Sequence, residues 1–335
     1  MKAMVCAEPM KMPVLDIAIP EIQPDEVLIK VARCGVCGTD VHIYKGEYIA
    51  TMPVVLGHEF SGTAERVGKN VQNFKPGDRV TVEPNVNCEK CYFCQIEQRN
   101  QCLNWSGIGV TRNGAFAEYV KAPEKNTFFI GDLSFEEAAF IEPVSCALYG
   151  LQQTKIQLGA EVLIFGAGPM GLLLMQMANH GNAAKVVMVE PHNNRRLLAE
   201  QLGCRYLFSS AEDLKKNMSK IAPLGFDVVI DATGVPAVVE SCFQYAKMGA
   251  TILMFGVCPK EDKITISPFD IFKNDWHILG TFASCATFPQ AIKMIQEKKV
   301  LVKSLLSHTL PLVDFSDVLK ILNTDTNRMK IQIEP

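Results

Sequence analysis

Four cysteines lie close together in one short segment, in the pattern C-x2-C-x2-C-x7-C. They are Cys88, Cys91, Cys94 and Cys102. Four thiolates at this spacing can close a tetrahedral zinc site that has no position left for substrate, which is typical of a structural metal. Disulfides are disfavoured because cysteines separated by two residues rarely pair without strain. An iron–sulfur cluster is the alternative, but it would bring redox chemistry that nothing else in the sequence demands. We therefore expect a structural zinc.

A second group of metal-binding side chains comes earlier in the chain. Cys37 lies in the segment CGVCGTDVH, which begins at Cys34, and His58 and Glu59 are neighbours in a Gly-His-Glu sequence. Glu142 adds a further carboxylate. A thiolate, an imidazole and a carboxylate leave a fourth zinc position open, as a catalytic metal requires. Spacing alone leaves two alternatives: Cys34 and Cys37 can be a redox pair, and a histidine beside a glutamate is common on polar surfaces.

A glycine-rich loop joins a run of buried-strand character to a helical run. Its residues are Gly166, Gly168, Pro169, Met170 and Gly171. A second apolar run ends at Glu190, about 20 residues further on, which completes the dinucleotide-binding fingerprint in its required context. The helix N-terminus would supply amide donors to the pyrophosphate, and Glu190 would accept hydrogen bonds from the adenosine ribose. A glycine-rich turn with no ligand is the alternative.

Two patterns of elements position these residues. Up to about residue 140, short β-prone runs such as 27–32, 62–67 and 78–82 predict a compact, mostly β domain. From about residue 161, apolar runs alternate with helical stretches. Strands are expected at 162–165, 186–189, 228–230 and 251–255, and helices at 171–180, 194–202 and 237–247. This alternation predicts a doubly wound parallel sheet. The tail lacks it, so we predict domains of 1–146 with 285–335, and 147–284.

Composition excludes several classes of partner. The net charge is −3 and no basic surface is concentrated enough for nucleic acid or an anionic membrane. The N-terminus lacks a signal-peptide pattern, and the longest apolar stretch, 162–178, is broken by three glycines and a proline. We expect a soluble, cytoplasmic protein whose twelve cysteines serve as thiolates and metal ligands rather than as disulfides.

Taken together, these motifs resemble the zinc-containing medium-chain dehydrogenases over essentially the whole chain. The matching segments are CGTD at 37–40, GHE at 57–59, the four-cysteine segment, Glu142-Pro143 and the glycine loop. GDRV at 77–80 and Glu83-Pro84 fit the polyol (sorbitol, xylitol, arabitol) dehydrogenases within that family. The resemblance implies an α/β protein with a mostly β, GroES-like catalytic domain and a Rossmann cofactor domain.

The resemblance also implies roles for individual residues. Cys37, His58 and Glu59 would bind the catalytic zinc, with Glu142 beside it or bound to it as coordination changes. Thr39 would take the proton from the substrate hydroxyl and pass it toward His42. Arg195 would lie beside the adenosine, and Cys34 would be an ordinary buried thiol. The implied cofactors are NAD and two zinc ions per chain. The implied reaction is oxidation of a polyol secondary alcohol to a ketone, in a homo-oligomer (a dimer or tetramer).

Two departures place sorbitol itself in doubt. Sorbitol-type members carry an Arg-Tyr pair that meets substrate hydroxyls, and Ala283 and Ser284 stand there in this chain. Ile43 also stands where those members often have tyrosine. A pentitol or a smaller diol is the expected alternative substrate.

Two other functions compete with polyol oxidation. CGTDVHIY at 37–44 and GIGVTRNGAFAEYV at 107–120 look like L-threonine dehydrogenase, whereas EPVS at 142–145 favours the polyol group. A non-catalytic relative that binds zinc or cofactor is the other alternative. It is disfavoured because Cys37 and His58 are both present. For the cofactor, the carboxylate of Glu190 favours NAD over NADP, although Arg195 and Arg196 follow and offer opposing charge.

Overall fold

The computed structural model describes all residues, 1–335, and divides them into two compact units. Unit 1 comprises residues 1–145, 283–297 and 302–335, and unit 2 comprises 146–282 and 298–301. The tail thus folds with the N-terminal part of the chain. The units differ from the predicted domains at three places: Cys146 and residues 298–301 belong to unit 2, and residues 283–284 belong to unit 1. Ser284 joins unit 1, where the amide of Asn85 lies 3.5 Å from its hydroxyl. Leu301 joins unit 2, where its N–H donates to Gln176 Oε1 at 2.7 Å.

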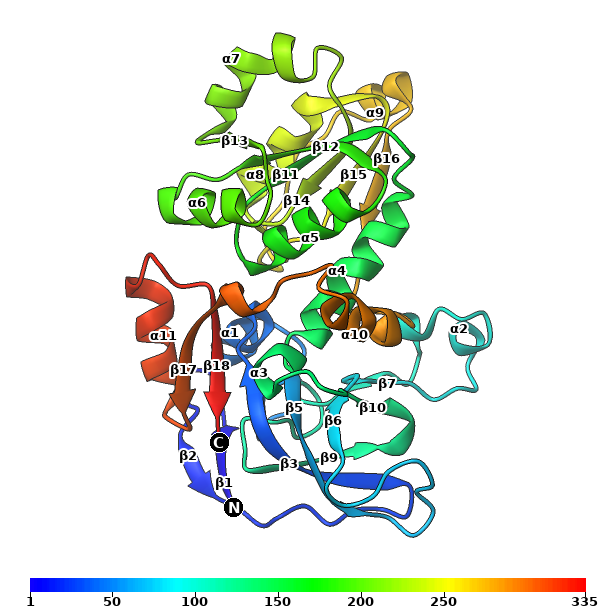
Figure 1. Ribbon diagram of the computed structural model, residues 1–335, viewed down its shortest axis with the longest axis vertical. Coiled ribbons are helices and arrows are strands. Elements are labelled where there is room, and N and C mark those ends of the chain that lie inside the picture. The colour runs from blue at the N-terminus through cyan, green and yellow to red at the C-terminus, as the bar shows by residue number, and fades with distance from the viewer. The chain divides into compact units, whose positions relative to one another are not determined.

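Unit 1 is built on a seven-stranded sheet with the order β10-β6-β5-β3-β18-β17, and β9 also pairs with β3. The strands are β3 (Glu26–Gly35), β5 (Glu59–Val67), β6 (Arg79–Val82), β9 (Tyr119–Pro123), β10 (Thr127–Phe129), β17 (Leu306–Pro311) and β18 (Lys330–Glu334). In Figure 1 the C-terminal strands β17 and β18, in orange and red, lie beside the blue N-terminal strands. The last strand of the chain is therefore a central strand of the first sheet.

Smaller elements complete unit 1. The strands are β1 (Lys2–Cys6), β2 (Val14–Asp16), β4 (Val54–Val55), β7 (Asn85–Val86) and β8 (Ser106–Gly107). The helices are α1 (Gly38–Lys45), α2 (Tyr92–Gln95), α3 (Phe135–Ala138), α10 (Phe288–Gln296) and α11 (Phe315–Thr324), with α4 (Ile141–Thr154) shared between the units. The core is continuous from the first strand to the last, because Met4, Phe60, Phe116 and Ile333 belong to one buried cluster.

Unit 2 is a six-stranded sheet, parallel throughout, with the order β13-β12-β11-β14-β15-β16. Its strands are β11 (Ala160–Phe165), β12 (Ala183–Val189), β13 (Tyr206–Phe208), β14 (Phe226–Asp231), β15 (Ala246–Met254) and β16 (His277–Gly280). Its helices are α5 (Pro169–His180), α6 (Asn193–Gln201), α7 (Ala211–Ile221), α8 (Pro236–Cys242) and α9 (Pro268–Asn274). Figure 1 shows α5 and α6 beside the row of strands. This strand order is that of the Rossmann fold, and its ligand edge is formed by the carboxyl ends of the strands.

One expected element ends too early. The helix predicted at 237–247 stops at Cys242 and is followed by a 3-10 turn, Phe243–Tyr245, and then by β15. Tyr245 packs against Phe165 of β11 with ring centroids 5.6 Å apart. This tertiary contact outweighs local helix propensity, which is a weak preference. No helix of the chain is both long enough and apolar enough to cross a bilayer.

Candidate active site and metal centres

Neighbouring strands bring Cys37, His58 and Glu59 together. Cys37 follows β3 directly and precedes α1, while His58 comes just before β5, which begins at Glu59. β3 pairs with β5 so that Gly35 faces Glu59 across the ladder. As a result the thiol, imidazole and carboxylate ligand atoms all lie within 4.8 Å of one another. Their spacing along the chain does not show whether these residues lie close together in the fold. The register between β3 and β5 brings them to one point.

Glycine at position 35 is required by space. A Cβ atom built on Gly35 would lie 2.2 Å from Glu59 Oε2, far inside van der Waals contact. Any larger residue there would therefore displace the carboxylate from the cluster.

The orientation of His58 depends on Asp40, which the sequence analysis missed. Asp40 is completely buried on α1, and its Oδ2 accepts the Cys37 N–H at 2.8 Å. Its Oδ1 lies 3.5 Å from His58 Nδ1. Burial is the largest influence on the pKa of His58 and lowers it, but Asp40 and Cys37 outweigh burial and raise the pKa well above 6.5. A carboxylate behind a metal-binding histidine is a common second layer in zinc sites. The sequence signal that could have identified Asp40 is its place as the fourth residue of the CGTD segment at 37–40.

Lys330, at the start of β18, forms a buried ion pair with Glu59. Its Nζ donates to Glu59 Oε1 at 2.6 Å and lies 2.5 Å from Oε2, and the two residues are 5% and 1% exposed. Burial lowers the pKa of Lys330, but the charges of Glu59, Cys37 and Glu142 oppose this effect and raise it to about 12. The ammonium group is thus the cation that balances the buried anionic groups.

The cluster has the chemistry of a zinc site. Asp40 lies behind His58 and Lys330 behind Glu59, and the ligand atoms of Cys37, His58 and Glu59 lie within 4.8 Å of one another. The donor set of one thiolate, one imidazole and one carboxylate is that of zinc. These residues fit a bound zinc ion: because Asp40 faces Nδ1 of His58, Nε2 would be the nitrogen available to the metal, together with the Cys37 thiolate and a Glu59 oxygen.

The other expected catalytic residues lie around this cluster. Glu142 begins the first turn of α4, is 8% exposed, and acts electrostatically on Lys330, but it is not among the three clustered ligands. Thr39 and His42 lie three residues apart on α1, so they share a helix face. Tyr48 was also missed. Burial raises the pKa of Tyr48, and its hydroxyl senses the charges of His58 and Cys37, which places it near the metal ligands.

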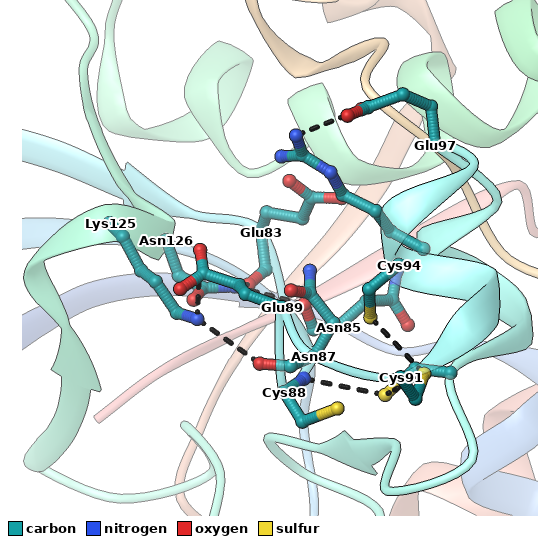
Figure 2. Close-up of polar contacts among 12 residues, drawn as sticks. Glu83, Asn85, Asn87, Cys88, Glu89, Cys91, Cys94, Glu97, Lys125 and Asn126 are labelled. Carbon is teal, nitrogen blue, oxygen red and sulfur yellow. Dashed lines mark hydrogen bonds and ion pairs between the residues drawn. The ribbon is translucent and has the colours of Figure 1, made fainter.

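The four-cysteine segment forms a second cluster. Its sulfur atoms also lie within 4.8 Å of one another, and those of Cys88, Cys91 and Cys94 converge in Figure 2. Hydrogen bonds from the Lys90 backbone amide and then from Asn104 lower the pKa of Cys88 to about 5. Burial raises the pKa of Cys94 to about 12. Without a metal, some of these cysteines would be ionised and others neutral at pH 7. A bound zinc ion would stabilise all four as thiolates.

Glu83 links this segment to the region of Glu142. Burial raises the pKa of Glu83 to about 7, with Arg99 opposing the shift and Glu142 adding to it. Figure 2 shows the Glu83 side chain lying above the cysteines, and its backbone carbonyl accepts a hydrogen bond from Asn126 at 2.9 Å. Asn126 thus holds the backbone of the segment that follows β6, since its side-chain amide donates to the carbonyl oxygens of both Glu83 and Asn85.

The glycine loop lies in unit 2 between β11 and α5. Gly166 has φ +96°, which disfavours any other residue, and a Cβ atom on Gly171 would lie 2.0 Å from the Gly166 carbonyl oxygen. Gly168 has open space around it except for Arg195 Nη1, 4.0 Å from where a Cβ atom would be. Pro169 and Met170 form the first turn of α5. The loop thus has a tight turn, close packing and an accessible central glycine.

Comparison with known proteins agrees with this arrangement. Residues 23–132 match the alcohol dehydrogenase GroES-like domain, and residues 169–297 match the zinc-binding dehydrogenase domain. A D-arabinitol dehydrogenase of Uromyces fabae is 35% identical over 340 residues, covering 100% of this chain and 97% of that protein. The chain belongs to the zinc-containing medium-chain dehydrogenase family. It is a nicotinamide-dependent zinc alcohol dehydrogenase, and the alternative of a non-catalytic relative is set aside.

Two further relatives are relevant to the choice of cofactor and of substrate. A solved zinc-binding dehydrogenase from Sinorhizobium meliloti, bound to NADP, has a TM-score of 0.94 and 35% identity, covering 100% of this chain and 99% of that one. An L-threonine 3-dehydrogenase of Shewanella woodyi is 35% identical over 250 residues, covering 72% of this chain and 73% of that protein.

The two metal clusters should differ in their resistance to chelation. The four-thiolate site has no exchangeable position, whereas the Cys37 cluster leaves one open. Dialysis against a mild chelator should remove about half of the zinc together with all activity, while the fold survives. Elemental analysis and circular dichroism before and after dialysis measure this. Loss of all zinc in one step, or one zinc per chain in fresh active protein, would contradict the assignment.

Replacing Lys330 should matter most when zinc is absent. Lys330→Met leaves the Glu59 carboxylate buried without a cation, which costs about 3–5 kcal/mol in the zinc-free protein. Bound zinc supplies the missing positive charge, so the loss should be much smaller in the loaded enzyme. Denaturant unfolding of both forms measures the difference. Lys320→Met, which removes an exposed lysine of unit 1, is the control. Equal losses with and without zinc would show that Glu59 does not face the metal.

Proposed function

We propose that this enzyme oxidises a polyol at a secondary hydroxyl, with NAD as the preferred hydride acceptor. The observation that carries the proposal is the open three-residue cluster of Cys37, His58 and Glu59, which offers a bound metal one thiolate, one imidazole and one carboxylate. Glu142 lies nearby with a second carboxylate that can accept a hydrogen bond from a neighbouring substrate hydroxyl. Relatives named for arabinitol, altritol and sorbitol support the polyol class.

A zinc ion bound in this cluster would act as a Lewis acid that lowers the pKa of the substrate hydroxyl, and a bound nicotinamide would be the hydride acceptor. The residues of the chain remove the proton. Thr39 has a hydroxyl that both accepts and donates, so it can pass the proton toward His42. His42 Nδ1 lies 2.8 Å from Glu47 Oε2. Because an ionised carboxylate only accepts, a neutral His42 carries its proton on Nδ1, and Nε2 is left to receive another.

The substrate contacts differ from those of sorbitol-type enzymes. Ser284 is 1% exposed and lies beside the Asn85 amide, and Ala283 has φ +55°. Neither residue offers the cation or the phenol of an Arg-Tyr pair. Tyr48 is a phenol near the metal ligands and can meet a second substrate hydroxyl instead. These residues favour a pentitol or a smaller diol over sorbitol.

NAD is favoured because a carboxylate follows β12. Glu190 stands at the position that meets the ribose 2′-hydroxyl in this fold, where a 2′-phosphate would be repelled. The Sinorhizobium meliloti relative was solved with NADP bound. We therefore propose that this enzyme prefers NAD but does not exclude NADP. The zinc-binding cysteines must stay reduced, which supports a cytoplasmic location.

The substrate class is tested with a panel of polyols, L-threonine and simple alcohols. We expect the highest kcat/KM on a vicinal polyol and negligible oxidation of L-threonine. The matched pair is 2,3-butanediol and 2-butanol, which differ in one hydroxyl. If the site binds that hydroxyl, the diol should react at least about tenfold faster. Threonine oxidised faster than every polyol would overturn the proposal in favour of the threonine dehydrogenase alternative.

We also propose a homo-oligomer that assembles through unit 2. Strand β16 has an unpaired edge, and the neighbouring helix α9 has no buried residue. Phe269 and Phe272 on α9 are 65% and 82% exposed, an apolar surface of the kind that marks subunit contacts. Sedimentation equilibrium should find a dimer or tetramer, and Phe272→Glu should weaken it. A monomeric wild-type protein at micromolar concentration would contradict this proposal.

A further inference from the structure

The carboxylate of Glu190 has few acceptor positions left for a cofactor. It is 3% exposed and accepts three hydrogen bonds from the protein. Oε2 accepts the N–H of Ala167 at 2.8 Å, and Oε1 accepts both the N–H and the ring Nδ1 of His192, at 2.9 and 2.6 Å. An ionised carboxylate offers about four acceptor positions in all. Glu190 can therefore accept about one more bond, so it cannot take both ribose hydroxyls of the adenosine.

His192 donates two of the three hydrogen bonds that the Glu190 carboxylate accepts. It stands at the N-cap position of α6, yet its side chain makes no capping bond and turns to Glu190 instead. Its side chain is 50% exposed while that of Glu190 is 3% exposed. Because the carboxylate only accepts, Nδ1 of His192 must carry a proton, and the outer nitrogen Nε2 is the one left for other partners.

Of the two arginines that follow, Arg196 donates to other groups and Arg195 lies along the glycine loop. Arg196 Nη1 donates to the carbonyl oxygens of Glu190 and Pro191, both at 2.7 Å, and its Nη2 donates to Asn193. Arg195 reaches the glycine loop beside Gly168. His192 is thus the side chain with an ionisable nitrogen that contacts the Glu190 carboxylate directly.

We propose that His192 is the specificity-determining residue of the cofactor site and makes it accept NADP as well as NAD. The inference rests on the proposed function only in taking Glu190 as the residue beside the ribose 2′ position. The ring bonded to that carboxylate lies beside the same ribose atoms. Its Nδ1 offsets part of the carboxylate charge, and its outer nitrogen donates to a 2′-phosphate when the ring is protonated. Glu190 then favours the 2′-hydroxyl without excluding the phosphate.

Equilibrium binding of NADH and NADPH, measured by nicotinamide fluorescence without any polyol, tests the proposal. The wild-type Kd values should lie within about tenfold of each other. His192→Ala should raise the Kd for NADPH by about tenfold, the usual effect of losing a charge-assisted hydrogen bond. The same variant should leave NADH binding unchanged or tighter, since an acceptor position on Glu190 is released.

Two variants make the test specific. His192→Asn keeps an N–H for Glu190 but lacks the outer nitrogen, so it should lose NADPH affinity and keep the wild-type NADH affinity. His180→Ala, at the exposed end of α5, should change neither value. Equal changes for both cofactors in the His192 variants, or unchanged NADPH binding, would overturn the proposal. So would a wild-type protein that binds neither cofactor. Binding of both cofactors without polyol oxidation would support this inference and refute only the proposed substrate.

Discussion

The buried ion pair between Lys330 and Glu59 is the interaction on which the catalytic unit depends. A carboxylate that is 1% exposed needs a cation, and Lys330 provides it from the last strand of the chain. Lys330 stands on β18, which lies beside β3, so the ion pair ties the tail of the chain to the first sheet. The same carboxylate faces Cys37 and His58, so Lys330 offsets negative charge at the whole cluster. A zinc ion held by Cys37, His58 and Glu59 would share the Glu59 carboxylate with Lys330.

The cofactor unit meets a different constraint, which is to bring backbone amides close to phosphate. No side chain would fit at Gly166 or at Gly171, and α5 begins between them, at Pro169. The parallel sheet places Glu190 at the carboxyl end of the next strand, as this fold requires. The residues that could hold the metal therefore all lie in unit 1, and the glycine loop lies in unit 2.

Local motifs made much of this predictable from the sequence. The four cysteines and the glycine loop each need only short-range spacing, and the alternation of apolar and helical runs predicted the parallel sheet. The metal-binding role of the GHE segment came from the family resemblance, because spacing alone left alternatives open. Lys330 was not predictable because it lies 271 residues from Glu59, and a single lysine carries no local signal. Asp40 and His192 were missed for a related reason: their roles depend on which way the side chain turns after folding. The helix predicted at 237–247 was too long because the contact of Tyr245 with Phe165 is tertiary.

Anomalous diffraction from crystals of the zinc-loaded enzyme, recorded on both sides of the zinc absorption edge, tests the central claim most directly. The account predicts two zinc positions per chain. One should be bonded to the four cysteine sulfurs, and the other to Cys37, His58 and Glu59 at about 2.0–2.3 Å. Glu59 should turn at least one oxygen from Lys330 toward the metal. A second zinc without Glu59 among its ligands, or no zinc at Cys37 in active crystals, would contradict the account.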